Sequence, residues 1–152
     1  MKQTYLSLIL LIERLHRRFL DVIKAELDRL KIEDINNVQT LILYNIGTEN
    51  LTIGELTVRG YYLGSNVSYN IKKLVENEYL VQERSSHDKR SFKIKLSAKG
   101  LSLIEKIDTL YQKNVEQLGS YNLGEPEMQI TTKHLKQLEN FWTGSIGNIL
   151  VM

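Results

Sequence analysis

The sequence GSNVSYNIKKLVENEYLVQERSSHDKRSFKIKLSAKG, residues 64–100, contains two different periodicities. Apolar residues recur at helical spacing from Val67 to Val75, which predicts an amphipathic helix over Ser65–Asn77. The segment Phe92–Leu96 instead alternates apolar residues with lysines, so we expect a strand that pairs with Leu80–Arg84 across a basic tip. A polar-faced helix followed at once by a cationic hairpin indicates that both elements touch the same polyanion.

Three further helices are predicted before this stretch. Residues 3–30 carry one long helical pattern, and a short helix over Asn37–Ile46 ends at Gly47. Thr52 and Glu55 have the spacing of a capping box, which predicts a third helix that stops near Gly60.

Two helices are predicted after the hairpin. Ser97 is expected to cap a long helix that continues to about Leu118. The sequence GSYNLGEP, residues 119–126, is typical of a break between helices, so we expect the last helix to begin at about Thr131.

The N-terminal helix is apolar on more sides than one core can cover. The run YLSLILLI, residues 5–12, is too short to span a bilayer, and no small-residue cleavage pattern follows it. We therefore expect a soluble, cytoplasmic chain without a membrane partner, in which a second subunit covers this helix.

Composition narrows the classes of protein and of site. With 152 residues, 42% of them hydrophobic, the chain is expected to form a single domain over residues 1–152. The absence of cysteine excludes disulfides and thiolate metal sites. The net charge is only +2, but residues 72–99 contain eight Lys and Arg against four Asp and Glu. Positive charge is thus concentrated in the helix and hairpin.

The outward face of the helix over Ser65–Asn77 has the side chains of a DNA reader. In a helix-turn-helix, the last helix enters the major groove. Asn and Ser can bond base edges, Tyr can contact a thymine methyl group or a phosphate, and Lys can neutralise phosphates. The outward residues are Asn66, Ser68, Tyr69, Asn70, Lys72 and Lys73.

The hairpin resembles the wing of the MarR family of transcriptional regulators. The sequence DKRSFKIKLS, residues 88–97, matches that family's Asp-x-Arg, strand and Leu-Ser pattern. Upstream, IGELTVRGYYLGSNVSYNIKKLVENEYLVQER, residues 53–84, is similar to the family's helix-turn-helix at matching spacing. The turn departs from the pattern at Gly60, Tyr61 and Leu63, and Ser65 is the best candidate for the cap of the next helix.

The resemblance implies a mainly α fold with a small β-hairpin wing. A winged helix-turn-helix would occupy residues 32–97, and residues 1–31 with 98–152 would form a helical dimerisation region. The resemblance also implies that Arg90 enters a minor groove while Asp88 holds a neighbouring arginine. The predicted DNA-binding residues are Ser65, Asn66, Ser68, Tyr69, Asn70, Lys72, Lys73, Asp88, Lys89 and Arg90.

By the same resemblance, the function is that of a transcriptional regulator of double-stranded DNA. It would bind a pseudo-palindromic operator as a homodimer, act as a repressor, and be released by a small-molecule effector. The predicted ligand-binding residues are His16, Phe19, Tyr44 and Tyr111, each of which could equally be a core or dimer residue.

Two other functions remain open. The hairpin could dock an acidic protein partner in a winged-helix interaction domain, although that would not require Asn and Ser on the helix. A sequence-independent architectural protein would need more positive charge. We expect neither an enzyme, a cofactor nor a metal, because the sequence has no catalytic motif and its three histidines lack ligand spacing.

Overall fold

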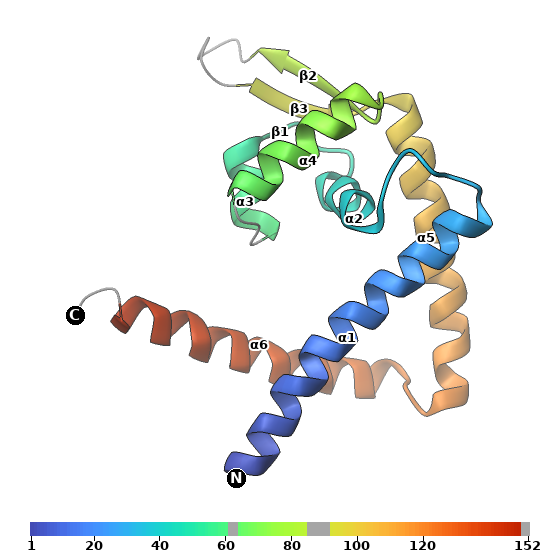
Figure 1. Ribbon diagram of the computed structural model, residues 1–152. Coiled ribbons are helices and arrows are strands. Elements are labelled where there is room, and N and C mark those ends of the chain that lie inside the picture. Colours follow the sequence, from blue (N-terminus) through green and yellow to red (C-terminus); the bar gives the residue numbers. More distant parts are fainter. Residues whose placement is uncertain (61–63, 85–91, 150–152) are drawn as a thin grey trace. The chain divides into compact units, whose positions relative to one another are not determined.

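The computed structural model describes residues 1–60, 64–84 and 92–149, and it is mainly helical with one small sheet, as predicted (Figure 1). The chain divides into two compact units, residues 1–110 and 111–152. The domain boundaries drawn from the sequence stay a prediction. The elements are α1 (Lys2–Arg29), α2 (Asn37–Ile46), β1 (Leu51–Thr52), α3 (Ile53–Gly60), α4 (Gly64–Glu76), β2 (Leu80–Arg84), β3 (Phe92–Leu96), α5 (Ala98–Leu118), the 3-10 turn η1 (Gly119–Tyr121) and α6 (Glu125–Ile149).

Three short helices and a hairpin make up the predicted winged helix. In Figure 1, α2, α3 and α4 lie together on one side of the sheet. Strands β2 and β3 are antiparallel, with Leu80 opposite Leu96 and Arg84 opposite Phe92. The two-residue strand β1 pairs with the other edge of β3, giving the order β1-β3-β2. The sequence did not predict β1, which is too short to show an alternating pattern.

The core of the first unit lies beneath the recognition-type helix α4. Val67, Ile71 and Leu74 are at most 3% exposed, which confirms three of the four residues of the predicted inward stripe, while Val75 is half-buried. They share the core with α2, α3 and β3. The C-terminal part of α1 and the part of α5 up to Leu110 also contribute to it. Each fully buried aliphatic side chain stabilises the fold by about 1.5–3 kcal/mol relative to exposure. The packing residues from these neighbours are Ile23, Leu27, Ile42, Leu43, Ile46, Leu56, Ile94, Leu103 and Ile107.

Two capping boxes fix where α2 and α3 begin. The side chain of Asn36 accepts from the backbone N–H of Gln39, and the Gln39 side chain accepts from the backbone N–H of Asn36. The same exchange joins Thr52 and Glu55, as the sequence predicted. Each box satisfies N–H groups that a helix start leaves without partners.

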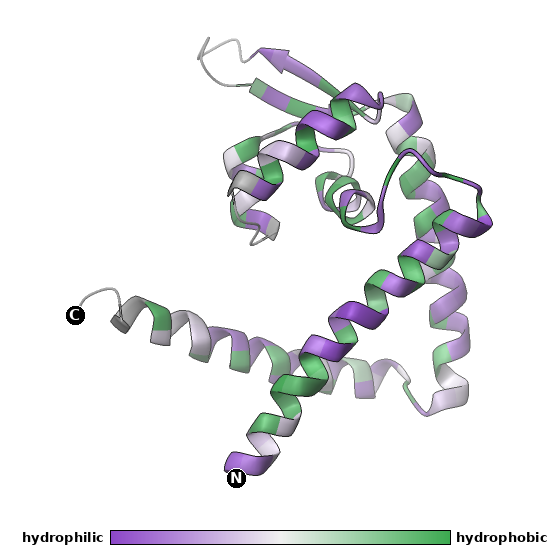
Figure 2. Cartoon of the chain, viewed as in Figure 1, coloured by the Kyte–Doolittle hydropathy of each residue, from purple (hydrophilic) through white to green (hydrophobic). Residues whose placement is uncertain are grey.

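The first two-thirds of helix α1 bury few side chains in the core of the first unit. Its first fully buried residue is Ile23, and its N-terminal half is strongly hydrophobic in Figure 2. The apolar residues before Ile23 that are 38–64% exposed are Tyr5, Leu6, Leu8, Leu10, Leu11, Leu15, Phe19 and Val22. The structure therefore bears out the apolar excess read from the sequence.

The start of α6, in the second unit, was predicted wrongly. This helix begins at Glu125, six residues before Thr131. Pro126 was read as a breaker, but proline is tolerated in the first turn, where no intrahelical N–H is needed. The carboxylate of Glu127 also accepts from the backbone N–H of Gly124, and acidic groups are favourable at a helix start.

Candidate nucleic-acid interface

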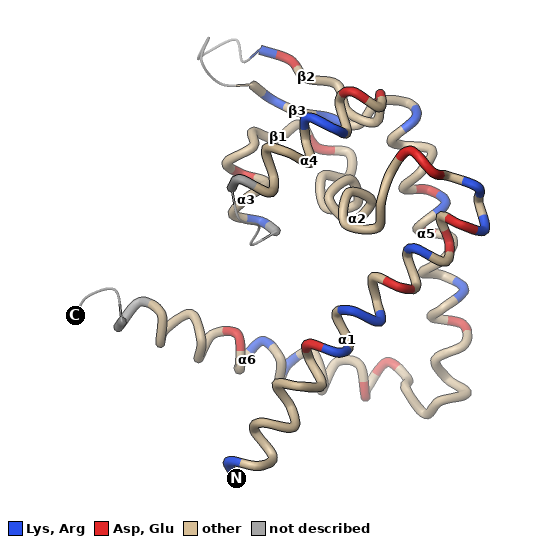
Figure 3. Tube along the Cα trace, in the orientation of Figure 1, with Lys and Arg blue, Asp and Glu red and all other residues tan. Residues whose placement is uncertain are grey.

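The exposed face of α4 carries most of the predicted DNA-binding side chains that the structure describes. Asn66, Ser68, Tyr69 and Lys72 are exposed, Tyr69 to 62%. Helix α4 begins at Gly64, so the expectation that Ser65 caps it was wrong: Ser65 lies inside the first turn. The side chain of Ser65 is outside the described part of the chain. Figure 3 shows basic positions on α4 and on both strands of the hairpin.

The predicted wing residues Asp88, Lys89 and Arg90 lie outside the described residues. Their assignment therefore stays a prediction. The strands β2 and β3 on either side of them are described, and they pair from Leu80 with Leu96 to Arg84 with Phe92.

Asn70 differs from its neighbours on α4 because its amide is engaged within the protein. Its Oδ1 accepts a hydrogen bond from Nε2 of Gln39 at 3.2 Å, and its Nδ2 donates to the backbone oxygen of Asn66 at 2.9 Å. The side chain is half-buried. Gln39 also belongs to the capping box of α2. Its side-chain amide therefore connects the start of α2 with Asn70 on α4. The base-reading role of Asn70 stays a prediction, and the structure gives this residue a second, structural role.

The two lysines of α4 share one carboxylate. Nζ of Lys73 lies 2.8 Å from Oε2 of Glu76, and Nζ of Lys72 lies 3.9 Å from its Oε1. The hydrogen bond with Glu76 raises the pKa of Lys73, and the same bond lowers the pKa of Glu76. The positive charge predicted for this face is thus partly balanced by α4 itself.

The hairpin is also partly neutralised along its strands. Lys95 forms an ion pair with Glu83, and Glu83 stands opposite Lys93 in the β2–β3 register. The guanidinium of Arg84 lies over the ring of Phe92, 5.9 Å from its centre. Opposite charges and cation–ring contacts of this kind stabilise neighbouring strands modestly.

Arg59 lies at the end of α3 and holds it to the segment that follows α2. Its two terminal nitrogens donate to the two carboxylate oxygens of Glu49, each at 2.8 Å, and one also donates to the backbone oxygen of Asn45 at 3.3 Å. A bidentate pair fixes orientation as well as distance. The sequence did not predict this contact, because Glu49 lies ten residues from Arg59 in a loop with no periodic pattern.

A second missed cluster joins three parts of the first unit, and we call it the Asp34 junction (Asp34, Asn77, Tyr79 and Lys99). The hydroxyl of Tyr79 and Nζ of Lys99 each donate to the Asp34 carboxylate at 2.6 Å. The amide of Asn77 donates to the Asp34 backbone oxygen at 2.6 Å, and Nζ of Lys99 lies 4.2 Å from the centre of the Tyr79 ring. The α1–α2 connection, the α4–β2 turn and the first turn of α5 therefore meet at one carboxylate.

Backbone packing beside the junction leaves room only for glycine. A Cβ on Gly100 would lie 2.3 Å from the backbone oxygen of Tyr79. Ser97 caps α5, as predicted, by accepting from the backbone N–H of Gly100, and its hydroxyl donates to the backbone oxygen of Glu78 at 2.6 Å. The start of α5 is thereby held against the turn that ends α4.

The Asp34 junction changes the titration of its acid groups. Burial raises the pKa of the Asp34 carboxyl, but the hydrogen bonds from Lys99 and Tyr79 outweigh it, so the pKa lies below its ordinary value. Burial, and then the bond to Asp34, raise the pKa of Tyr79.

The predicted ligand residues are not all brought together. A cavity of about 460 Å³ is lined by Tyr44, Gly47, Thr48, Ile104, Glu105 and Asp108. The Tyr44 hydroxyl donates to Asp108 at 3.0 Å. His16 and Phe19 are exposed on α1 and do not line this cavity, and Tyr111 belongs to the second unit. The ligand assignment stays a prediction, with Tyr44 the residue that a cavity supports.

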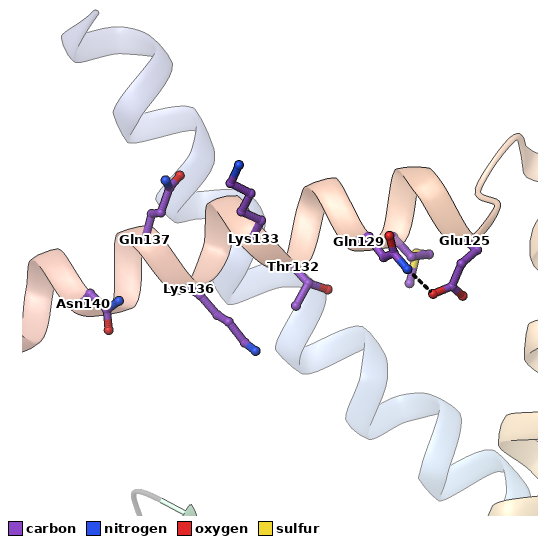
Figure 4. A pocket seen from close by; sticks show the side chains of 8 residues that line it. Glu125, Gln129, Thr132, Lys133, Lys136, Gln137 and Asn140 are labelled. Atoms are coloured by element: carbon purple, nitrogen blue, oxygen red, sulfur yellow. Dashed lines mark hydrogen bonds between the residues drawn. The ribbon is translucent and has the colours of Figure 1, made fainter.

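A depression of about 520 Å³ follows α6, and all the residues that line it come from that helix. Figure 4 shows their side chains projecting from both sides of the helix, with Gln129 donating to Glu125 at 2.7 Å. Such an arrangement has no polar groups that converge on a ligand.

The described part of the chain contains neither a cluster of metal ligands nor a helix that could span a membrane. Within residues 1–60, 64–84 and 92–149, no three His, Asp or Glu side chains are placed to share a metal ion. Every helix in the same ranges is too short or too polar to cross a bilayer.

Comparison with known proteins identifies the fold of the first unit. Residues 33–91 match the model of the MarR family. The exopolysaccharide II synthesis transcriptional activator ExpG of Rhizobium meliloti (strain 1021) is 45% identical over 100 residues, which are 66% of this chain and 52% of the relative. The chain thus spans about half the length of the curated relative that it matches.

Solved structures show the same architecture over most of the chain. Streptococcus pneumoniae FabT in complex with DNA is 19% identical and covers 92% of this chain and 98% of its own, with a TM-score of 0.72. The S. aureus MepR–DNA complex is 19% identical over 87% and 95%, with a TM-score of 0.73. Staphylococcus aureus MarR in complex with salicylate and kanamycin is 24% identical over 94% and 93%, with a TM-score of 0.74. These likenesses establish the fold that the chain shares with these proteins, a winged helix within a mainly helical chain.

The Asp34 junction predicts a pH-dependent loss of stability. Because the folded-state pKa of Asp34 is lowered, its carboxylate stabilises the fold above the ordinary carboxyl pKa of about 3.9, and this contribution is lost as the pH falls through the folded value. At pH 7, Asp34→Asn should lower the free energy of unfolding by about 1 kcal/mol, a value reduced for partial exposure of the ion pair.

Urea unfolding of both proteins between pH 7 and pH 3 measures this difference, which should shrink at the acid end. Asp28→Asn is the matched control, because Asp28 forms an exposed ion pair with Lys24 at 2.8 Å on the surface of α1. An equal effect of the two substitutions at pH 7 would contradict a special role for the junction.

Proposed function

Because residues 33–91 match the model of the MarR family, we propose that the chain is a transcriptional regulator that binds double-stranded DNA. The observation that carries the proposal is the exposed polar face of α4 beside a hairpin rich in lysine. The curated relative is itself named a transcriptional activator, and two of the similar structures are complexes with DNA. We propose no enzymatic activity for the chain.

The proposed contacts divide into base reading and phosphate binding. Asn66, Ser68 and Tyr69 lie on the first two turns of α4, the part of a recognition helix that meets base edges. Lys72 and Lys73, one turn further on, would neutralise phosphates. The predicted tip residues Lys89 and Arg90 would extend the contact to the flanking minor groove.

We infer that the chain works as a homodimer. The apolar residues exposed on the first two-thirds of α1 form a surface that water covers unfavourably. A second copy would bury it and would place two α4 helices in successive major grooves. The operator would then be a pseudo-palindrome with half-sites about 10 bp apart, one helical turn of DNA.

The direction of regulation would follow from where the operator lies. Repression, the outcome expected from the sequence, results if the dimer covers the promoter. Activation, the role named for the curated relative, results if the dimer sits upstream and assists the polymerase. A promoter fusion with the operator in each position distinguishes the two.

A small-molecule effector is proposed to act at the cavity beside Tyr44. A ligand that binds better to the form with misplaced recognition helices would release DNA by shifting the population. Couplings of this kind are typically about 1–3 kcal/mol, or 5–150-fold in DNA affinity. Loss of DNA binding on titration of salicylate, the ligand of one similar structure, tests this step.

The first experiment is DNA binding measured by fluorescence anisotropy. The purified chain should bind the DNA upstream of its own coding region about a thousandfold more tightly than a scrambled duplex of equal length. Repeating the titration at several salt concentrations should give a log–log slope equivalent to several phosphates.

If both duplexes bind equally and the salt slope is steep, the chain is an architectural DNA-binding protein and not a sequence-specific regulator. Absence of binding to either duplex would contradict the proposed function. It would favour the alternative in which the hairpin docks an acidic protein, to be sought by pull-down.

Two asparagines on α4 should respond differently to alanine. Asn66→Ala removes an exposed amide and should cost about 1–3 kcal/mol of discrimination between the specific and scrambled duplexes. Asn70→Ala instead leaves the Gln39 amide without its acceptor and should lower the free energy of unfolding by about 1 kcal/mol. Anisotropy and urea unfolding of both variants measure the two effects. An equal loss of discrimination would mean that Asn70 also reads bases.

The proposed dimer predicts the mass of the particle in solution. Light scattering at micromolar concentration should give twice the 17.7 kDa of the chain. Leu8→Glu with Leu11→Glu places charges on the exposed apolar face of α1 and should shift the mass toward one chain, because burying unpaired charge is costly. A wild-type mass of one chain would refute the dimer.

A further inference from the structure

Glu76 occupies the position at which both lysines of α4 can reach one anion. It lies in the last turn of the helix, three residues after Lys73 and four after Lys72. Nζ of Lys73 is 2.8 Å and Nζ of Lys72 is 3.9 Å from its two carboxylate oxygens. All three side chains are 44–75% exposed, so the group is open to solvent and to any larger anion.

The chemistry of this carboxylate resembles that of a DNA phosphate. Both present oxygens that carry negative charge to a lysine ammonium group. A phosphate that approaches α4 therefore competes with Glu76 for the positive charge of both lysines. The exposed ion pairs are weak enough to be exchanged, because solvent and salt screen them.

We propose that Glu76 is an intramolecular competitor for DNA phosphates, and that it sets how much sequence-independent affinity the regulator has. The inference rests on the proposed DNA-binding function and adds to it a residue that opposes binding. Phosphate contacts carry no sequence information, whereas base contacts do. A carboxylate that weakens only the lysine contacts lowers the background of non-specific binding.

The position of Glu76 separates it from the proposed base-reading residues. Asn66 lies ten residues earlier on α4, about 15 Å along a helix that rises 1.5 Å per residue. Removal of the carboxylate should therefore leave base reading intact. The effect should appear equally on specific and scrambled duplexes, as more affinity and a steeper dependence on salt.

The test compares Glu76→Gln with Glu78→Gln in the chain of 152 residues. Glu78 is an exposed carboxylate in the turn after α4, two residues further on, and its side chain has no ion pair among the described contacts. It controls for the general effect of removing one negative charge near DNA. Both variants are titrated by anisotropy against the specific and scrambled duplexes at several salt concentrations.

Glu76→Gln should bind both duplexes about threefold to tenfold more tightly than the wild type at low salt. Its log–log salt slope should steepen by up to about 2, since each freed lysine releases about 0.9 counterion on binding. Glu78→Gln should change affinity by no more than about twofold and leave the slope unaltered.

A second background shows whether the lysines transmit the effect. With Lys72→Met and Lys73→Met in place, Glu76→Gln should behave like the Glu78→Gln control. If Glu76→Gln matches the control in the native background, or keeps its effect without the lysines, the inference is overturned while the proposed function stands. If the wild type binds neither duplex, the proposed function fails first and the inference fails with it.

Discussion

The carboxylate of Asp34 is the contact on which the arrangement of the first unit depends. It lies in the connection between α1 and α2, and it accepts hydrogen bonds from Tyr79, which follows α4, and from Lys99, which begins α5. Beside it, Gly100 allows α5 to approach the backbone oxygen of Tyr79. One charged group thus fixes the helix that leaves the winged region and the turn that leads from α4 into the hairpin.

The charges of the winged region are more balanced than the sequence count indicates. Residues 72–99 have a large excess of Lys and Arg, but several of these cations already have acidic partners in the fold. Lys73 pairs with Glu76, and Lys95 pairs with Glu83. A net count therefore gives the sign of the surface potential, while the pairing decides how much charge remains for a ligand.

Local patterns predicted most of the fold, because most elements are fixed by local chemistry. The capping box at Thr52, the stripe from Val67 to Leu74 and the alternating strand at Phe92 all follow from residues close in sequence. The junction of Asp34 with Lys99 could not be predicted, since its partners are 65 residues apart and neither has a distinctive neighbourhood. The start of α6 was missed for a different reason, because Pro126 was taken as a stop although it suits a first turn.

The hydrogen bond between Gln39 and Asn70 links the face of α4 that carries Asn66 to the stability of the start of α2. Asn70 cannot be exchanged freely, because Gln39 would lose its acceptor and the N-terminus of α2 would lose support. A descendant of this chain that replaces Asn70 should therefore also change position 39. The two positions would evolve as a pair, although 31 residues separate them. A change at position 66, where the side chain is exposed, would not require a second change at position 39.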